Sequence, residues 1–441
     1  MASTSLTRTV SVTGNTFKGT LSMWFKRSVT DQEEYLFENY ETSGNRFFVR
    51  LLSTGQLGME TLQGSSTVMQ INTLNQFFDV GSWYHIVVGI DSTLATAGDR
   101  VKVYINGVQQ TSYNDETQPP QDQNMSINEG NPTYVTVGRK YGASEYFDGS
   151  MSQVIWIDGT QYAASTFGST DSTSGEWKPN ADPSVTYGTN GFKLTFEDTS
   201  SLGDDTSGNT NDLATSGTPT STLDCPSNNF SVLNNDTYHF TNQWQANTNG
   251  GTTANGGSGS AWKTILPTLG DSSGKYYFEA KLISSGSNCI IGAVDIDNQK
   301  QNSSSSWYIG QDSTGQGYQN NGTASNGGAS YGTSYVNNDI IGVAMDLDNS
   351  KIYFSKNGTW QESGDPTSGA SGTGALSLTA NTTYTFALSS YAGTVWNCNF
   401  GNGVFGTTAV TSAGTSASTP GTFEYDVPTG YQPLTTKGLN V

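Results

Sequence analysis

The sequence predicts an all-β protein of two tandem β-sandwich domains, joined by an irregular linker and followed by a C-terminal tail. Many short segments alternate apolar and polar residues at a spacing of two, as strands with one buried face do. The 52 glycines among 441 residues suit frequent turns between such strands. Hydrophobic residues make up only 33%, yet aromatic residues reach 11%, a share that indicates packed cores rather than disorder.

The first domain is expected to contain one strand after another. The expected strands cover residues 21–25, 45–52, 81–91, 101–105, 134–138 and 147–158. Segment 81–91 is the most apolar, which favours a central strand. Asn106-Gly107 follows the strand at 101–105, and this dipeptide predicts a tight hairpin turn. Helical periodicity is nearly absent, apart from one short turn expected within 162–167.

The second domain centres on a longer hairpin, at residues 339–360. Ile341 and Val343 belong to a run in which apolar residues recur at every second position. A turn follows, then a return strand, and Asn357-Gly358 predicts the second turn. The two halves of the chain therefore use the same kind of hairpin.

These elements predict four segments. Residues 191–196 read as one additional strand inside the linker, and residues 431–434 as the apolar anchor of the tail. The tail is expected to pack on the domains or on a neighbouring subunit. The predicted segments are a β-sandwich at 1–175, a connector at 176–235, a second β-sandwich at 236–402 and an extended tail at 403–441.

Charge excludes several classes of partner. The formal net charge is −19 and the sequence pI is about 4.3, so the surface repels phosphate backbones and anionic lipids. No apolar run approaches the roughly 20 residues that span a bilayer, and the N-terminal residues lack a signal-peptide pattern. We expect no nucleic-acid binding, no membrane insertion, and synthesis in a cytoplasm.

Catalytic groups are scarce, so we expect no enzyme activity. A glycosidase needs two carboxylates flanking the scissile bond, and the four glutamates of residues 33–41 are instead expected in a solvated loop. His85 lies in the apolar strand and is expected to pack there with a hydrogen bond, and His239 is interpreted in the same way. These residues supply no catalytic triad or nucleophile elbow.

Metal ligands are also sparse. The three cysteines are far apart in sequence, which argues against a disulfide framework and a zinc site. We expect no cofactor. The best loop for a structural calcium ion is Asp204-Asp205 with Asn209 and Asp212, for which turn structure is the competing interpretation.

Candidate ligand-binding residues are three tyrosines in the second domain. Tyr318, Tyr331 and Tyr335 lie among Gly, Asn and Ser residues, a composition typical of adaptable binding surfaces. Packing in the core is the alternative explanation.

Residues 1–175 resemble the laminin G-like, concanavalin A-like jelly-roll family. In that family the Trp-Tyr-His strand and the Asn-Gly hairpin are core elements of a two-sheet sandwich. The resemblance rests on the motifs Thr20-Leu-Ser-Met-Trp-Phe-Lys-Arg27, Gly81-Ser-Trp-Tyr-His-Ile-Val-Val88, Val103-Tyr-Ile-Asn-Gly107, Val137-Gly-Arg139 and Phe147-Asp-Gly-Ser-Met-Ser-Gln-Val154.

Residues 236–402 resemble the SPRY domain, a β-sandwich that mostly binds peptides or proteins through loops at one end. The hairpin at 339–358 is its most specific motif. The other motifs are Gly274-Lys-Tyr-Tyr-Phe-Glu-Ala-Lys281, Ile290-Ile-Gly-Ala-Val-Asp-Ile-Asp297, Trp307-Tyr-Ile-Gly310, Tyr384-Thr-Phe-Ala-Leu388 and Val395-Trp-Asn-Cys-Asn-Phe-Gly401.

The connector is similar to linkers between sandwich modules in structural proteins of tailed bacteriophages. This resemblance implies a virion protein exposed on the particle, with other virion proteins as partners and assembly as a homo-oligomer. We expect a tail-fibre-like or adhesin-like protein that contacts a host surface glycan or protein. The alternatives are a capsid decoration or vertex protein and, with less support, a polysaccharide depolymerase.

Overall fold

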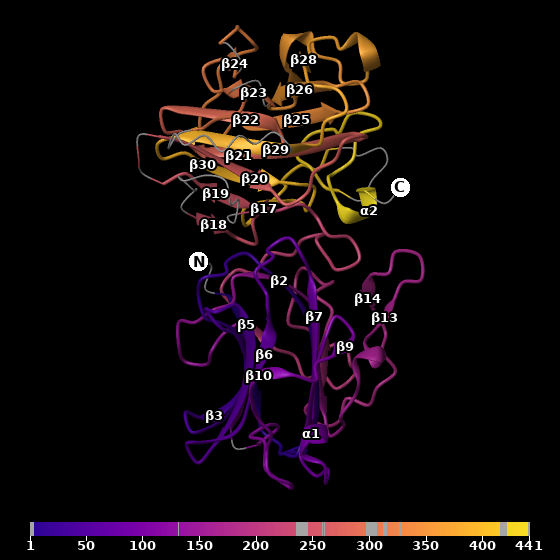
Figure 1. Cartoon of the computed structure of the whole chain (residues 1–441). Helices are drawn as coiled ribbons and strands as arrows, with labels where there is room; N and C mark the ends of the chain where they lie inside the picture. Colours follow the sequence, from indigo (N-terminus) through magenta and orange to yellow (C-terminus); the bar gives the residue numbers. More distant parts are fainter. Residues whose placement is uncertain are drawn as a thin grey trace. The chain divides into compact units, whose positions relative to one another are not determined.

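The protein is all-β, with two compact units that each contain a β-sandwich (Figure 1). The structure is a computed structural model that describes residues 4–130, 132–234, 246–257, 259, 261–296, 307–311, 315–325, 328–414 and 421–439. The first unit is Met1–Ser221 and the second is Thr222–Val441. The residues predicted as a connector are thus divided, with most of them in the first unit.

The first unit pairs an eight-stranded sheet, in the order β10-β6-β5-β4-β3-β11-β1-β16, with a six-stranded sheet, in the order β15-β12-β2-β7-β8-β9. The strands of the larger sheet are β1 (Ser5–Val10), β3 (Glu34–Thr42), β4 (Asn45–Leu51), β5 (Gln56–Gln63), β6 (Ser66–Gln76), β10 (Tyr113–Thr117), β11 (Thr133–Val137) and β16 (Ala214–Ser216). Those of the smaller sheet are β2 (Lys18–Arg27), β7 (Tyr84–Asp91), β8 (Val101–Ile105), β9 (Val108–Gln109), β12 (Gly149–Asp158) and β15 (Phe192–Leu194). A separate hairpin of β13 (Gly168–Thr170) and β14 (Trp177–Pro179), the helix α1 (Ala97–Arg100) and the 3-10 turn η1 (Ala164–Thr166) complete the unit.

The core of the first unit lies between these sheets. Strands β2 and β7 pair at the centre of the smaller sheet, as the apolar segment 81–91 predicts. Trp156 on β12 contacts Phe37 on β3, with ring centroids 5.1 Å apart, so one large aromatic pair spans the two sheets. The predicted strand at 191–196 is present as β15, at the edge of the smaller sheet. Strand β16, which the sequence does not predict, pairs with β1.

The second unit has the same two-sheet plan. Its six-stranded sheet has the order β17-β20-β29-β22-β23-β24, and its eight-stranded sheet the order β18-β19-β30-β21-β25-β26-β27, with β28 also paired to β26. The strands of the first are β17 (Leu233–Asn234), β20 (Trp262–Pro267), β22 (Asn288–Asp295), β23 (Gly315–Gln319), β24 (Thr323–Ala324) and β29 (Tyr384–Tyr391). Those of the second are β18 (Ala246–Thr248), β19 (Thr253–Asn255), β21 (Lys275–Ser284), β25 (Ile340–Asp346), β26 (Lys351–Lys356), β27 (Thr359–Trp360), β28 (Leu376–Ser377) and β30 (Val395–Asn399). The remaining elements are η3 (Gln361–Ser363), η4 (Gly369–Ser371), the hairpin of β31 (Val404–Phe405) and β32 (Thr408–Ala409), and α2 (Thr436–Leu439).

Both predicted Asn-Gly hairpins are present, as β8–β9 and β26–β27. Asn106 and Asn357 have φ of 47° and 48°, and the glycines that follow have φ of 81° and 78°. Two consecutive residues in the left-handed region match the right-handed twist of the flanking strands. This local chemistry explains why the turns were readable from the sequence.

The tail packs on its own unit. Tyr431 and Leu434 are each 1% exposed, which confirms the predicted anchor. The backbone N–H of Gln432 donates to Lys275 O, and Gln432 O accepts from the N–H of Tyr277. The tail therefore forms a short parallel bridge beside β21.

Candidate functional site

The three tyrosines predicted to bind a ligand are core residues. Tyr318, Tyr331 and Tyr335 are only 0%, 4% and 1% exposed, so the predicted exposed surface is wrong. Tyr318 lies within 6 Å of both other rings, at 5.7 and 5.0 Å. The hydroxyl of Tyr335 donates toward the carbonyls of Cys289 and Tyr318. Tyr318 lies in strand β23, and Tyr331 and Tyr335 lie in the segment that follows β24. All three side chains turn inward, and this direction is not encoded in the Gly- and Asn-rich composition around them.

The predicted solvated loop of glutamates is also wrong. Glu34 and Glu38 lie in β3 and are both 0% exposed. Glu34 is opposite Leu51, whose side chain is in the core, whereas Glu38 is opposite Phe48, whose side chain points outward. A bulge at Leu36 changes the alternation between them. Because directly opposed residues share a face, the two carboxylates point to opposite sides of the sheet.

His85 packs in the core with both ring nitrogens engaged, as the sequence predicts. Nδ1 accepts from Trp177 Nε1 at 2.9 Å, so Nε2 carries the proton and donates to Ser22 Oγ at 2.9 Å. A donating Nε2 cannot take a proton from Ser22, so the pair is no nucleophile and base. His239 lies outside the described residues.

The predicted calcium loop is filled by the chain's own donors. Asp205 Oδ1 accepts from the N–H groups of Lys193 and Ser207, and Oδ2 from Ser207 Oγ and the N–H of Asn211. Asp212 Oδ1 accepts from the N–H of Asp205. The turn interpretation describes this geometry. Over the residues that the structure describes, no three His, Cys, Asp or Glu side chains form a metal-binding group.

Apolar clusters cover three of the four outward sheet faces. On the smaller sheet of the first unit, Val87 and Ile155 pack under Phe167. On the smaller sheet of the second unit, Ile290 packs under Trp307. On the larger sheet of the second unit, Tyr277, Ala344 and Tyr353 pack under the tail residues Phe423, Val427 and Tyr431. Among the described residues, no such cluster covers the larger sheet of the first unit, and we call its outward side the open face.

Aromatic and charged residues form rows across the open face. Strand register places the members of a row directly opposite one another, with their side chains on one side. The first row is Gln70, Glu60, Phe48, Glu38, Thr136 and Thr7. The second row is Leu62, Arg46, Tyr40, Tyr134 and Thr9.

Two arginines lie against the central ring of this face. The guanidinium carbons of Arg46 and Arg50 are 4.8 and 5.0 Å from the centroid of Phe48. Arg46 also pairs with Glu38 at 3.4 Å, and Arg50 pairs with Glu60 at 3.6 Å. Arginine over an aromatic ring with flanking carboxylates is a rigid, partly dehydrated arrangement that presents several donors.

Tyr141, from the loop after β11, stacks on one tyrosine of the second row and packs at a tilt against another. Its ring centroid is 4.2 Å from that of Tyr134 and 4.7 Å from that of Tyr40. The backbone N–H of Tyr141 donates to Glu38 Oε2 at 2.6 Å. Burial raises the pKa of Glu38 to about 7, against the lowering effects of this hydrogen bond and of Arg46. The carboxyl at the centre of the face therefore titrates near neutral pH.

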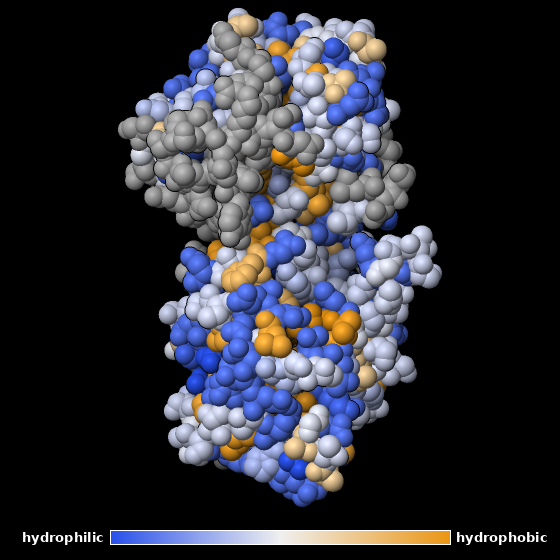
Figure 2. All heavy atoms as spheres, in the orientation of Figure 1, coloured by the Kyte–Doolittle hydropathy of each residue, from blue (hydrophilic) through white to orange (hydrophobic). Residues whose placement is uncertain are grey.

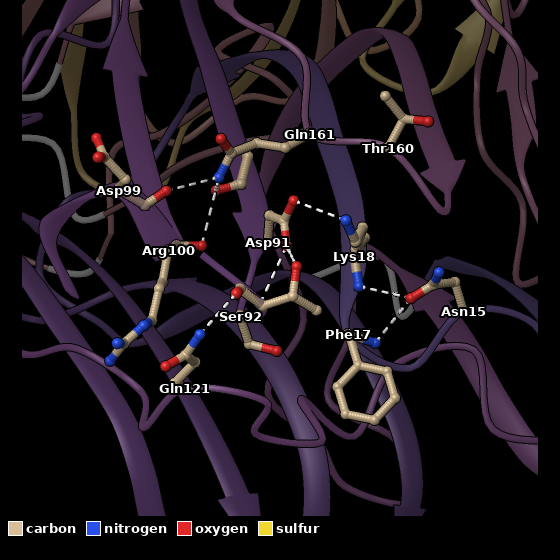
Figure 3. Close-up of polar contacts among 12 residues, drawn as sticks. Asn15, Phe17, Lys18, Asp91, Ser92, Asp99, Arg100, Gln121, Thr160 and Gln161 are labelled. Atoms are coloured by element: carbon tan, nitrogen blue, oxygen red, sulfur yellow. Dashed lines mark hydrogen bonds and ion pairs between the residues drawn. The ribbon is translucent and has the colours of Figure 1, made fainter. Parts of the chain in front are cut away.

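A second polar cluster lies at the rim of the same unit, where several loops meet (Figure 3). Lys18 pairs with Asp91 at 3.0 Å. The side-chain nitrogens of Arg100 donate to the carbonyls of Leu94, Ala95 and Pro119. The amide of Gln161 likewise donates to main-chain carbonyls, including that of Asp99 (Figure 3). These donors are committed to the main chain, so the cluster fastens loops and is the weaker candidate for a ligand site.

The open face is the candidate functional site, and sequence reasoning missed it. Arg46-x-Phe48-x-Arg50 alternates along one strand, which was a readable signal. The neighbouring rows come from strands that are distant in sequence, and their register is not readable from it. Tyr and Arg are the residue types that contribute most at protein binding surfaces. In the coloured part of Figure 2, most surface residues are hydrophilic, and hydrophobic residues form scattered spots.

Family comparisons agree with the two sandwiches. Residues 2–165 match the Laminin_G_3 family, described as the concanavalin A-like lectin/glucanases superfamily. Residues 275–389 match the SPRY domain family. The chain therefore combines a concanavalin A-like jelly-roll domain with a SPRY domain, as the resemblances predicted. No curated protein sequence matches the chain significantly.

Similar solved structures cover single domains. The SPRY domain of human HERC1 has 15% identity and a TM-score of 0.26, over 33% of this chain and 87% of that one. The heptameric SAP-like pentraxin of Limulus polyphemus has 17% identity and a TM-score of 0.26, over 36% of this chain and 71% of that one. In the described residues, no helix is both long enough and apolar enough to cross a membrane.

Proposed function

We propose that this protein is a non-enzymatic binding protein that recognises a surface glycan through the open face of its first unit. The observation that supports this most is the contrast between the four sheet faces. Three are covered by apolar segments of the chain, and the fourth carries tyrosines, arginines and carboxylates in register. Tyrosine offers an apolar ring for the C–H face of a sugar and a hydroxyl for its edge.

A binding role is favoured over hydrolysis because the carboxylates are poorly arranged for catalysis. Glu34 and Glu38 lie on opposite sides of the sheet, and on the open face Glu38 and Glu60 are held by arginines. Retaining hydrolysis needs two carboxyl groups about 5 Å apart that flank the scissile bond and are free to react. A depolymerase would release sugar from a bound polysaccharide, and we expect no release.

We place the protein on the surface of a tailed-phage particle, as a tail-fibre-like or adhesin-like homo-oligomer. This part of the proposal is supported by the resemblance of residues 176–235 to phage linkers. Antibodies against residues 236–402 should label the tail of purified virions. Label over the head would instead favour a capsid decoration or vertex protein and would contradict host attachment.

The glycan proposal is tested by binding of the full-length protein to host cells and their surface polysaccharides. Tyr40→Ala and Arg46→Ala should each weaken binding by about 10-fold, since each removes a contact worth roughly 1–2 kcal/mol. Tyr187→Ala is the matched control, because Tyr187 is a half-buried tyrosine against the opposite, covered sheet. Retention of full binding by both open-face variants would contradict the proposal.

A further inference from the structure

Tyr40 and Tyr134 are neighbours across two adjacent strands. They oppose each other directly in the register of β3 and β11, which puts their Cβ atoms roughly 5 Å apart on the open face. Neither side chain is fully buried. Both rings contact the same third ring, that of Tyr141, and with Tyr134 the two planes differ by only 15°.

The third ring comes from a surface loop, not from a strand of the sheet. Tyr141 follows the end of β11 and is half-buried, while Gly142 and Ser144 are exposed. Gly142 has φ of 71°, and nothing lies within 4 Å of the position that a Cβ atom would take. A glycine is the residue that adopts this left-handed conformation without a steric cost, and it places a conformationally permissive position directly after Tyr141.

Two contacts hold Tyr141 on the other rings. Its N–H donates to Glu38 Oε2 at 2.6 Å, and Lys140 pairs with Glu145 across the loop at 3.0 Å. Arg46, directly opposite Tyr40 on the other side of β3, has a buried Nε with no hydrogen-bond acceptor. Arg46 therefore holds a donor that the protein itself leaves unsatisfied.

We propose that Tyr40 and Tyr134 form a seat for one pyranose ring of the glycan, and that Tyr141 occupies this seat until the ligand displaces it. This inference rests on the proposed function and adds the ligand class and the residue that competes with it. A pyranose is a ring of similar size whose C–H face packs on tyrosine, and its hydroxyls suit the partly exposed guanidinium of Arg46. A side chain that occupies the seat lowers the apparent affinity, because only the open fraction binds.

The experiment measures binding of methyl glycosides of glucose, galactose, N-acetylglucosamine and rhamnose to the full-length protein, by calorimetry and saturation-transfer NMR. Tyr141→Ala removes the internal occupant, so the best ligand should bind about 2- to 10-fold more tightly, the equivalent of one aromatic contact. Tyr40→Ala and Tyr134→Ala should each weaken binding. Tyr146→Ala is the control from the same loop, since Tyr146 contacts Arg139, and its affinity should equal that of the wild type.

The inference is decided by whether Tyr141→Ala raises or lowers the affinity for the glycoside. Weaker or unchanged binding by a folded Tyr141→Ala protein overturns it, because Tyr141 would then be a ligand contact or a bystander. In that case binding by the wild type still supports the proposed function. Binding by Tyr141→Ala alone supports the inference that Tyr141 occupies the site. Failure of every protein to bind these glycosides overturns the inference, whereas the host-polysaccharide assay decides the proposed function. Thermal melts of each variant show whether the protein is folded.

Discussion

Trp177 Nε1 donates a hydrogen bond of 2.9 Å to His85 Nδ1, a residue 92 positions earlier in the chain. His85 also stacks on Trp24, with ring centroids 4.6 Å apart. Trp177 lies on β14, in the segment predicted to be a connector. This contact therefore holds the start of the predicted connector against the central strands. Connector residues as far as Tyr187 belong to the apolar cluster that covers the smaller sheet of the first unit.

Acid should weaken the first unit through His85. Burial lowers the pKa of His85 to about 3 from its ordinary value of 6.5. A group whose folded pKa is depressed binds protons more readily when unfolded, so stability is lost as pH falls from about 6.5 toward 3. Denaturant unfolding should show a loss on the order of 3–5 kcal/mol from His85 over this range. In His85→Phe, which is less stable at neutral pH, this part of the pH dependence should disappear, and an unchanged slope would contradict the assignment.

The two Asn-Gly turns contain the same side-chain bridge. Asn106 Oδ1 accepts from the N–H of His85 and Asn357 Oδ1 from that of Ile340, each at 2.8 Å. The backbone N–H of each asparagine donates to the carbonyl of the same partner, at 2.9 and 2.8 Å. Each asparagine therefore adds two hydrogen bonds to the end of its strand pair, one from its backbone and one through its side chain.

Substitutions at Asn106 should separate this bridge from the backbone requirement. Asn106→Gly keeps the left-handed conformation and loses the bridge, at a cost of about 1 kcal/mol. Asn106→Ala loses the bridge and adds the left-handed penalty, for a total of about 2–3 kcal/mol. Unfolding in urea measures both costs, and the same order is expected for Asn357. Equal costs for Gly and Ala would show that the conformation is not a source of strain.

The sequence predicted the features that depend on neighbouring residues and failed where distant residues decide. Both Asn-Gly hairpins and strand β15 were readable because turn chemistry and alternation are local. The direction of Tyr318 depends on contacts with residues such as Phe354, 5.8 Å away between ring centroids. Glu34 and Glu38 lie on opposite faces of the sheet because of one bulge, and no residue type in β3 predicts that bulge. Tyr134 stacks on Tyr141 next to Tyr40. This arrangement could be predicted only with knowledge of the register between β3 and β11, which the sequence does not provide.

The buried ion pair of Arg27 and Glu34 should be costly to break on one side only. Both side chains are 0% exposed, and Arg27 Nη2 lies 2.9 Å from Glu34 Oε2. Glu34→Ala leaves a buried guanidinium without its counter-charge, so we expect a loss of about 3–5 kcal/mol in denaturant unfolding. The double variant Arg27→Met, Glu34→Leu should recover part of that loss, because it removes both charges. The N–H of Asp148 and the carbonyl of Phe77, which these side chains satisfy, limit the recovery. A double variant less stable than Glu34→Ala would contradict this account.

A rise in pH through about 7 should loosen the tail through Glu279. This carboxyl is 0% exposed and accepts from the N–H groups of Glu424 and Tyr425, at 2.8 and 2.9 Å, and from the hydroxyl of Tyr277. Burial raises its pKa from 4.5 to about 7, although these hydrogen bonds oppose the shift. The folded state thus holds a proton that the unfolded chain releases, so the stability from this group is present below pH 4.5 and is lost as pH rises through about 7.

Denaturant unfolding across this range should therefore show a loss on the order of 1–3 kcal/mol that Glu279→Gln abolishes. Glu34 and Glu38 titrate near the same pH, but both remain in the variant, so the difference between the two proteins isolates Glu279. Hydrogen exchange at the amides of Glu424 and Tyr425 reports the same event locally. In the wild type it should accelerate above pH 7 by more than the intrinsic base-catalysed rate. If these two amides stay protected while global stability falls, the carboxyl does not hold the tail.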